Sequence, residues 1–316
     1  MNNQRSAVTT CILLMFAGVF LWLLTGFTLA GAALPAINAI DAGSASALRA
    51  RYDERLDKLN SNIFQRPLVL ESTQTSKDIK GDIYAVVPHT FAAVSASLTG
   101  PQGWCDVLIL HLNTKYCKTS REQSGTALVM NVGKKYDQPL ADSFQLTFAW
   151  KLEDQRADYM RVLLRADVGP FSTHDYRITL EAVPLDNGKT FLHLAYAYGF
   201  GVGGKLAMSA YFNTIGRDKV GFTVVGKDSD GKPEYVDGMR GLVERNTMRY
   251  YLAIESYLSA LEVKGPQQFE KRIKEWFVAT ERYPRQLHEM EQVEYLEMKR
   301  KEYARQQLAV KTGSSG

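Results

Sequence analysis

The stretch Met239–Leu261, MRGLVERNTMRYYLAIESYLSAL, decides the fold because its apolar residues recur at steps of three and four along its whole length. Val243, Tyr250 and Ile254 share one face of the helix that this spacing predicts, whereas Arg240 and Glu244 fall elsewhere. A long helix with such a stripe must bury it against another element. The preceding residues should therefore supply a sheet.

Strand patterns fill the chain before this helix, and several alternate apolar and polar residues as antiparallel strands with one covered face do. They lie at residues 82–87, 126–131, 143–152, 159–165, 176–183, 190–198 and 220–225. Turn-forming residues at 185–188 and 227–231 predict hairpins. Two short helices are expected at 89–98 and 101–112, between the first strand and the others. A further amphipathic helix is expected from Ser44, which can cap it, to Asn60.

This order of strand, two short helices, several strands and one long helix resembles the helix-grip fold of the START-like (SRPBCC) superfamily, which includes lipid-transfer and polyketide-cyclase-like domains. The resemblance covers residues 78–262. It implies an α+β fold in which a curved antiparallel sheet grips a long C-terminal helix around an apolar cavity for a hydrophobic ligand. A helical lead-in at 40–77 and a charged helical extension at 263–316 are not part of the common domain.

Large apolar and aromatic side chains on the strands and the long helix are the candidates for contact with such a ligand. Tyr and Trp can bind a polar end of a ligand while burying the remainder. The same residues can also pack into a solid core, so both interpretations stay open. The candidate ligand-binding residues are Trp104, Phe148, Trp150, His193, Tyr196, Tyr198, Phe222, Met239 and Tyr250.

These residues predict a protein that binds or carries a hydrophobic small molecule or a lipid. One alternative is an enzyme of the polyketide-cyclase type, in which His193 or Tyr198 acts as an acid or base. Another is a structural envelope protein with a solid core. No catalytic residue is assigned. No metal or cofactor is expected, because the histidines lack metal-ligand spacing and Gly199–Gly204 lacks the context of a dinucleotide site.

The first residues predict export. No charged side chain lies between Arg5 and Asp41, and residues 11–24 are almost entirely apolar. Residues 1–39 are therefore a signal peptide with cleavage after a small residue, or an uncleaved membrane anchor. In both cases the remaining chain lies outside the cytosol. In a bacterium that means the periplasm or the outer face of the inner membrane.

Cys105 and Cys117 form an even pair in the exported part, where an oxidising compartment favours a disulfide. A continuous helix would hold their Cα atoms roughly 18 Å apart, beyond the reach of a disulfide. The bond therefore requires a chain reversal, which the turn-forming residues 113–115 can supply. Two unpaired structural thiols are the alternative.

The 316 residues carry a net charge of only +4, with 38 basic and 34 acidic side chains, and this excludes the concentrated basic face of a nucleic-acid-binding protein. The C-terminal extension alternates charges and carries a stripe that includes Phe269, Ile273 and Trp276 before Pro284 interrupts it. Its helices should pack back on the domain or bind a protein partner.

Overall fold

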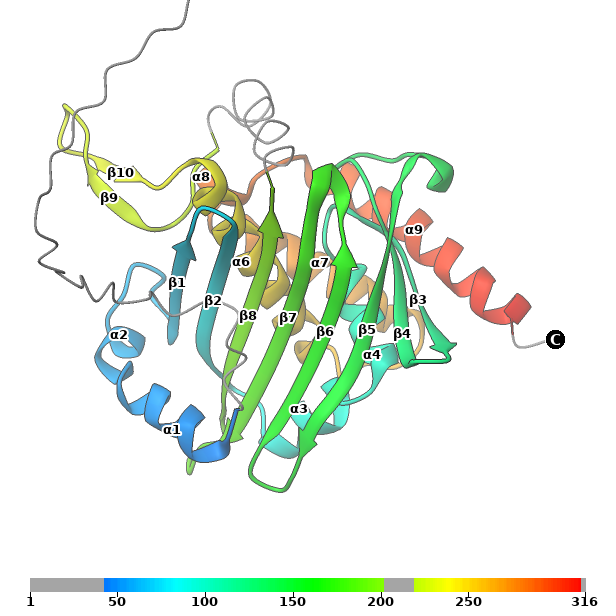
Figure 1. Ribbon diagram of the computed structural model, residues 1–316, viewed down its shortest axis with the longest axis horizontal. Coiled ribbons are helices and arrows are strands. Elements are labelled where there is room, and N and C mark those ends of the chain that lie inside the picture. Colours follow the sequence, from blue (N-terminus) through cyan, green and yellow to red (C-terminus); the bar gives the residue numbers. More distant parts are fainter. Residues whose placement is uncertain (1–42, 202–218, 314–316) are drawn as a thin grey trace, which may run out of the picture. The chain divides into compact units, whose positions relative to one another are not determined.

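The computed structural model describes residues 43–201 and 219–313, with side chains as far as Leu308 (Figure 1). The predicted signal or anchor segment lies outside these residues. Among the helices described, none combines the length and the apolar character that crossing a bilayer requires.

An eight-stranded antiparallel sheet in the order β1-β2-β8-β7-β6-β5-β4-β3 forms the centre of the fold. A separate hairpin, β9-β10, projects beside it (Figure 1). The strands are β1 Leu68–Gln74, β2 Asp78–Val87, β3 Thr114–Glu122, β4 Gly125–Val132, β5 Phe144–Gln155, β6 Met160–Val168, β7 Thr173–Pro184, β8 Thr190–Phe200, β9 Val224–Lys227 and β10 Pro233–Tyr235.

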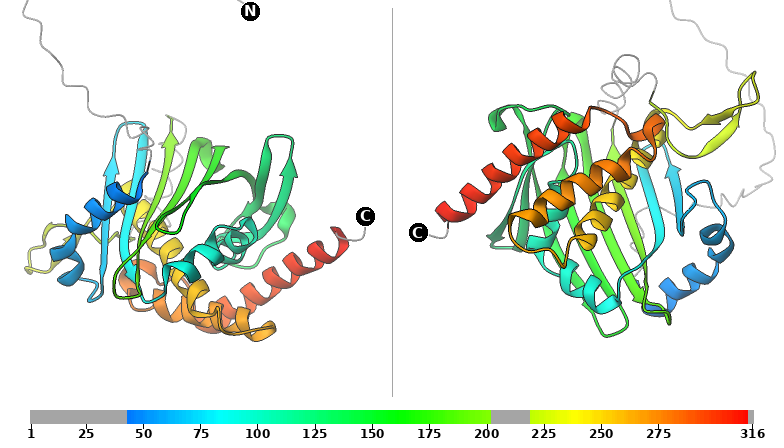
Figure 2. Two further views of the ribbon diagram at one scale, coloured as in Figure 1. Left: turned by 90° about the horizontal axis from the view of Figure 1, so that it is seen from below. Right: turned by 180° about the vertical axis from the view of Figure 1, so that it is seen from behind.

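Helices cover both faces of this sheet. The long helix α6, Gly238–Ser259, lies along the face that we call inner, together with α3 and α4 (Figure 2). The remaining helices are α1 Ala45–Asp53, α2 Leu56–Asn60, α3 Phe91–Leu98, α4 Pro101–Leu108, α7 Pro266–Thr280, α8 Pro284–Leu287 and α9 Gln292–Gly313. Short 3-10 turns occur at Leu140–Asp142 and Pro170–Ser172.

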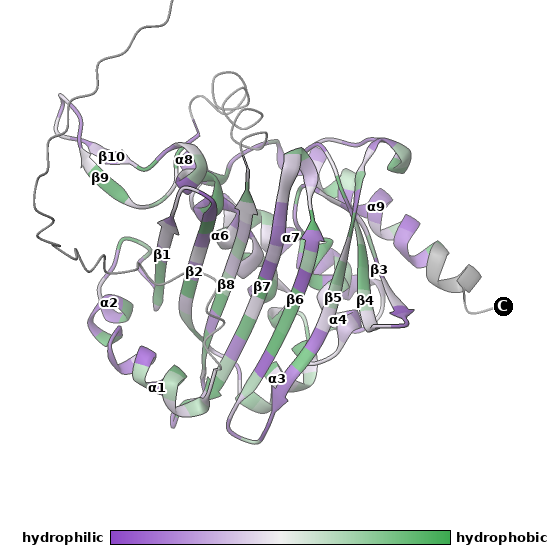
Figure 3. Cartoon of the chain, viewed as in Figure 1, coloured by the Kyte–Doolittle hydropathy of each residue, from purple (hydrophilic) through white to green (hydrophobic). Residues whose placement is uncertain are grey.

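The two sheet faces follow the alternation of the sequence. On β5, Leu146 and Phe148 are buried in the inner core, whereas Thr147 and Ala149 are exposed. Figure 3 shows bands of hydrophobic and hydrophilic colour along the strands. All of β8 is buried, because α1 and α2 cover the outer face near β1, β2 and β8. The expected α+β fold, a curved antiparallel sheet gripping a long helix, is confirmed.

The buried carboxylate of Glu244 holds α6 in place. It accepts hydrogen bonds from the backbone of Phe222 and Thr223 at 2.6 and 2.9 Å, and from the hydroxyls of Thr223 and Ser72 at 2.6 and 2.5 Å. Arg240, one helical turn earlier, donates to the Ser72 hydroxyl at 3.1 Å. The helix is thus connected to β1 and to the segment that follows residue 219.

Four local features differ from the expectations. The lead-in is not helical throughout, because residues 68–74 form the edge strand β1. The strand β3 at the other edge was missed, and the second short helix ends at Leu108. The expected helix at 44–60 is interrupted between Asp53 and Leu56, although Ser44 caps its beginning as expected.

The C-terminal extension is helical, as predicted, and packs on the domain. The indole of Trp276 on α7 donates to the carbonyl of Arg249 on α6 at 3.1 Å. Helix α9 covers the edge strand β3, where the Gln306 side chain accepts from the Cys117 backbone at 3.2 Å. This contact satisfies an edge amide that would otherwise be free to pair with another strand.

The predicted disulfide is confirmed. It joins Cys105 on α4 to Cys117 on β3, with the Cα atoms 5.2 Å apart and both side chains fully buried. The reversal lies at residues 109–113, just before β3 begins.

Replacing both cysteines, Cys105→Ser with Cys117→Ser, should lower the free energy of unfolding by about 3 kcal/mol, because the unfolded chain loses a cross-link. Chemical denaturation of both proteins measures this difference. Reduction of the wild type in the denaturant should shift its midpoint in the same direction and leave the double variant unchanged. Equal midpoints for oxidised wild type and variant would contradict a stabilising role for the bond.

Candidate functional site

Four tyrosines meet on the inner face, in a group that we call the tyrosine cluster. Tyr196 and Tyr198 lie two residues apart on β8 and therefore share one face. Tyr176 lies on β7, and Tyr250 comes from α6. The ring centroids are 5.2 Å apart for Tyr196 and Tyr250 and 5.1 Å apart for Tyr176 and Tyr198. The sequence thus places three of the predicted ligand-binding residues together.

The hydroxyls of this cluster differ in their partners. Tyr176 shares a hydrogen bond of 2.7 Å with the hydroxyl of Thr173. Within the described part of the chain, the hydroxyls of Tyr196, Tyr198 and Tyr250 form no hydrogen bond. Burial raises the pKa of all three, and the neighbouring Tyr176 raises each further. At neutral pH these hydroxyls are therefore uncharged groups that can both donate and accept hydrogen bonds.

His111 extends the cluster toward the disulfide. Its ring stacks on Tyr250 with centroids 4.8 Å apart, and its Nδ1 accepts from the backbone of Asn113 at 3.2 Å. Burial, and then the charges of Arg249, Lys299 and Lys135, lower the pKa of His111 well below its ordinary value. The neutral ring consequently carries its proton on the buried Nε2. The Asn246 side chain lies beside the ring and opposes the lowering of the pKa, although Nε2 reaches no described partner at full hydrogen-bond geometry.

Trp150 supplies another unpaired donor on the same face. It is opposite Leu164 on β6, which in turn is opposite Ile178 on β7 and then Tyr196 on β8. The indole Nε1 is buried and has no hydrogen-bond partner among the residues described. Three strand spacings separate Trp150 from Tyr196, about 14 Å along the sheet. An elongated ligand lying across β5 to β8 would reach both.

His193 lies on the outer face, away from α6, so it does not belong to this site. Its Nε2 is 2.7 Å from Asp82 and its Nδ1 is 3.1 Å from Glu181. Carboxylates therefore face the ring on both sides, and neither ring nitrogen is open to a ligand on the inner face. The suggestion that His193 acts as an acid or base in a pocket is therefore wrong on geometric grounds.

The other charges around His193 are also paired. Glu181 accepts from Arg161 at 2.9 Å, from Tyr159 at 2.5 Å and from Arg51 of α1 at 3.2 Å. Burial by itself would raise the pKa of Glu181, but the contacts with His193, Tyr159 and Arg161 outweigh it and lower the pKa to about 2. This outer polar cluster ties α1 to the sheet and has a structural role.

The remaining predicted residues lie apart from the tyrosine cluster or in its walls. Trp104 is buried on α4 with its indole already donating to the Leu98 carbonyl at 2.8 Å. Phe222 packs against Phe64 and Tyr283, with centroids 5.6 and 5.5 Å away. Phe148 is buried on the inner face of β5, and Met239 packs partly buried against the same core. Their part in ligand binding stays a prediction.

Tyr176 and His111 are the two members of the site that the sequence interpretation missed. Tyr176 shares its strand phase with Ile178 and Leu180, so the alternation already assigned it to the inner face. His111 offered no such signal. It lies just before β3, outside any regular element, and only the folded chain brings it against Tyr250.

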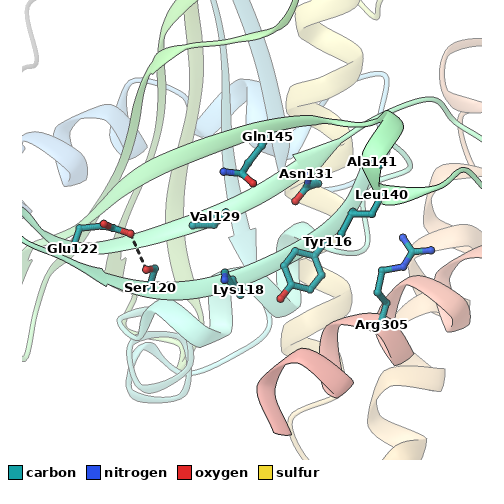
Figure 4. A pocket seen from close by; sticks show the side chains of 10 residues that line it. All are labelled: Tyr116, Lys118, Ser120, Glu122, Val129, Asn131, Leu140, Ala141, Gln145 and Arg305. Atoms are coloured by element: carbon teal, nitrogen blue, oxygen red, sulfur yellow. Dashed lines mark hydrogen bonds between the residues drawn. The ribbon is translucent and has the colours of Figure 1, made fainter. Parts of the chain in front are cut away.

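A separate hollow of about 600 Å³ lies on the outer face of β3 to β5, beside α9 (Figure 4). Lys118 and Arg305 line it together with Glu122, which accepts a hydrogen bond from Ser120 at 2.7 Å. This surface bears both charge signs and is not continuous with the tyrosine cluster, because it lies on the opposite side of the sheet. Among the described residues, no group of three His, Cys, Asp or Glu side chains is placed to hold a metal ion.

Comparisons with known proteins find only distant similarity. No protein-family model matches the chain, and no curated protein matches it either. Similar solved structures include norcoclaurine synthase from Thalictrum flavum, with 13% identity and a TM-score of 0.31 over 45% of this chain and 77% of that chain. A conserved protein from Geobacillus kaustophilus has 9% identity and a TM-score of 0.32 over 57% of this chain and 95% of its own. Human StAR-related lipid transfer protein 5 has 9% identity and a TM-score of 0.28 over 54% and 88%. Scores and identities this low carry no argument about function.

The charge on Glu181 should make the fold sensitive to acid. Because its pKa is lowered from 4.5 to about 2, its stabilising contribution is complete above pH 4.5 and is lost as the pH falls. That contribution is about 3 kcal/mol, lost between about pH 5 and pH 2. Unfolding measured across this range should give a flatter pH profile for Glu181→Gln than for the wild type. The exposed control Glu122→Gln should follow the wild type, and parallel profiles for all three would contradict the assignment.

Proposed function

We propose that this chain is an exported, START-like protein that binds or carries a hydrophobic small molecule or lipid between the sheet and α6. The observation that supports it is the buried Nε1 of Trp150, which has no hydrogen-bond partner among the described residues, on the same sheet face as the hydroxyls of Tyr196, Tyr198 and Tyr250. A buried polar group without a partner costs about 1–3 kcal/mol. Several such groups at one place are expected where a ligand supplies the missing hydrogen bonds.

The composition of the site suggests how such a ligand would lie. Leu164, Ile178 and Leu180 present an apolar floor on β6 and β7, and Trp150 and the tyrosine cluster stand at its two ends. An apolar body would cover the floor, and an oxygen-bearing group would receive hydrogen bonds from the hydroxyls. This division into an apolar surface with a few polar groups is typical of small-molecule sites.

The two alternative functions require different properties of the same residues. A polyketide-cyclase-like enzyme would depend on Tyr198, because His193 faces the outer side. The raised pKa of Tyr198 makes it a proton donor and not a base at neutral pH. A structural envelope protein would require no ligand at all, with the tyrosines simply filling the core.

Extraction and native mass spectrometry of the protein purified from its host would distinguish these functions. A bound apolar compound, released by solvent and absent from a control purification, supports carriage. Mass spectra of the empty chain only, combined with no displacement of the neutral fluorophore N-phenyl-1-naphthylamine by any lipid, would support the solid core and overturn the proposal.

Export, by signal peptide or by membrane anchor, is part of the same proposal. Its support is the uncharged, apolar start of the sequence and the buried disulfide between Cys105 and Cys117, which is typical of proteins outside the cytosol. Cell fractionation with mass measurement of the mature N-terminus would separate a cleaved signal from an anchor. An intact protein in the cytosolic fraction would contradict both.

Removing one unpaired hydroxyl should weaken ligand binding without weakening the fold. Tyr250→Phe should leave the free energy of unfolding of the empty protein unchanged or raise it by up to about 3 kcal/mol, because no internal hydrogen bond is lost and a hydroxyl without a partner is removed. Ligand affinity, measured by displacement of N-phenyl-1-naphthylamine, should fall by about two- to tenfold.

Tyr295→Phe is the matched control. The Tyr295 hydroxyl donates to the Leu110 carbonyl at 2.9 Å, and its ring stacks on Trp276. This variant should lose about 1 kcal/mol of stability and keep the ligand affinity. Unchanged affinity in Tyr250→Phe would show that the hydroxyl does not contact the ligand.

A further inference from the structure

A surplus of positive charge surrounds the His111 end of the tyrosine cluster. Lys135 from the β4–β5 loop, Lys219, and Arg249 of α6 converge on one carboxylate, that of Glu289. The three N–O distances are 2.6, 3.2 and 2.8 Å respectively. We call these four residues the basic cluster. Three cations and one anion leave it with two uncompensated positive charges.

Two further lysines and one glutamate add to the positive charge near His111. Lys115 and Lys299 are fully buried around the single carboxylate of Glu302, at 2.9 and 2.7 Å. Lys299 also donates to the carbonyls of His111 and Thr114 at 2.6 and 2.9 Å. These lysines are saturated with acceptors inside the protein, so their role is to hold α9 against the loop before β3.

The basic cluster differs because its lysines keep spare donor capacity. Within the described ranges, the only ion partner of Lys135 is Glu289, and about a quarter of each lysine side chain, 27%, is exposed. Burial and the charge of Arg249 lower the pKa of Lys135 to about 8 despite the contact with Glu289. The carboxylate of Glu289 therefore does not compensate Lys135 for burial and for the charge of Arg249, and an additional anion would favour the charged form of Lys135.

The geometry connects this charge to the ligand site. His111 stacks on Tyr250, and Arg249 and Lys135 are both close enough to His111 to lower its pKa. The charge of Arg249 also acts on Tyr250, where it opposes the rise of the tyrosine pKa. The potential is thus positive at the place where the unpaired hydroxyl of Tyr250 and the protonated Nε2 of His111 lie together.

We infer that the ligand of the tyrosine cluster is an anionic amphiphile, whose acidic group lies beside His111 and Tyr250 under the attraction of Lys135, Lys219 and Arg249. This inference rests on the proposed function and specifies its ligand class. The acidic oxygens would accept from the His111 Nε2 and the tyrosine hydroxyls, and the apolar chain would extend over β7 and β6 toward Trp150. A carboxylate and a phosphate ester both satisfy this chemistry.

Two probes of equal chain length separate charge from hydrophobicity. Hexadecanoic acid and 1-hexadecanol, each at pH 7, where Lys135 is charged, are titrated against the full-length protein loaded with N-phenyl-1-naphthylamine. The wild type should bind the acid at least about tenfold more tightly than the alcohol, a difference of about 1.4 kcal/mol. Hexadecyl phosphate in place of the acid tells a preference for phosphate from one for carboxylate.

The variant Lys135→Gln with Lys219→Gln removes the two surplus charges and keeps the pair between Arg249 and Glu289. It should bind the acid about tenfold more weakly and the alcohol unchanged. The control Lys118→Gln with Lys189→Gln makes the same change in net charge at two exposed positions on the outer hollow and the β7–β8 turn. The control should behave as the wild type does.

Three outcomes would overturn, respectively, the anionic ligand class, the role of the basic cluster and the proposed function. Equal affinity of the wild type for acid and alcohol would overturn the anionic ligand class while leaving hydrophobic-ligand binding intact. A preference for the acid that survives in Lys135→Gln with Lys219→Gln would overturn the role of the basic cluster. Displacement by none of the probes, together with no co-purifying compound, would instead overturn the proposed function itself.

Discussion

The position of α6 depends on the buried carboxylate of Glu244. Moving a carboxylate out of water costs several kcal/mol, and this cost is offset only if good hydrogen bonds replace the water. Glu244 has four such bonds, from Ser72 on β1 and from Phe222 and Thr223 in a segment far away in sequence. Because the donors belong to two separate parts of the chain, α6 cannot slide or rotate without leaving a buried charge unpaired.

Fixing Glu244 also fixes what the rest of the helix presents to the sheet. Thr247 approaches β2 at Gly81, where a Cβ atom would collide with the threonine hydroxyl. Tyr250 follows Glu244 by six residues, which is about 120° around the helix in the opposite sense. When Glu244 faces β1, Tyr250 consequently faces His111 and Tyr196. One buried charge on one side of α6 therefore determines which hydroxyl enters the candidate site on the other.

Sequence patterns identified the elements with strong periodicity and missed those without it. The stripe from Met239 to Leu261 predicted α6 to within two residues at its end, and the alternation on β5 and β8 was correct. The strands β1 and β3 lie at the sheet edges and bury only their first residues, so neither shows a buried alternation along its whole length. Alternation separated His193 from Tyr196 and Tyr198, but periodicity alone does not tell which sheet face the long helix covers. That choice depends on contacts between distant residues, such as Glu181 with Arg51 of α1.

The two faces of β8 show how satisfied and unsatisfied polar groups indicate different roles. On the outer face every charge around His193 has a partner, so the free energy gained there goes into holding α1 on the sheet. On the inner face of the same strand, the hydroxyls of Tyr196 and Tyr198, three and five residues after His193, lack partners among the described residues. A core selected only for stability would replace such tyrosines by phenylalanine, which fills nearly the same space without a buried hydroxyl. The tyrosines beside a surplus of positive charge are explained if the inner face, and not the outer face with His193, contacts the ligand.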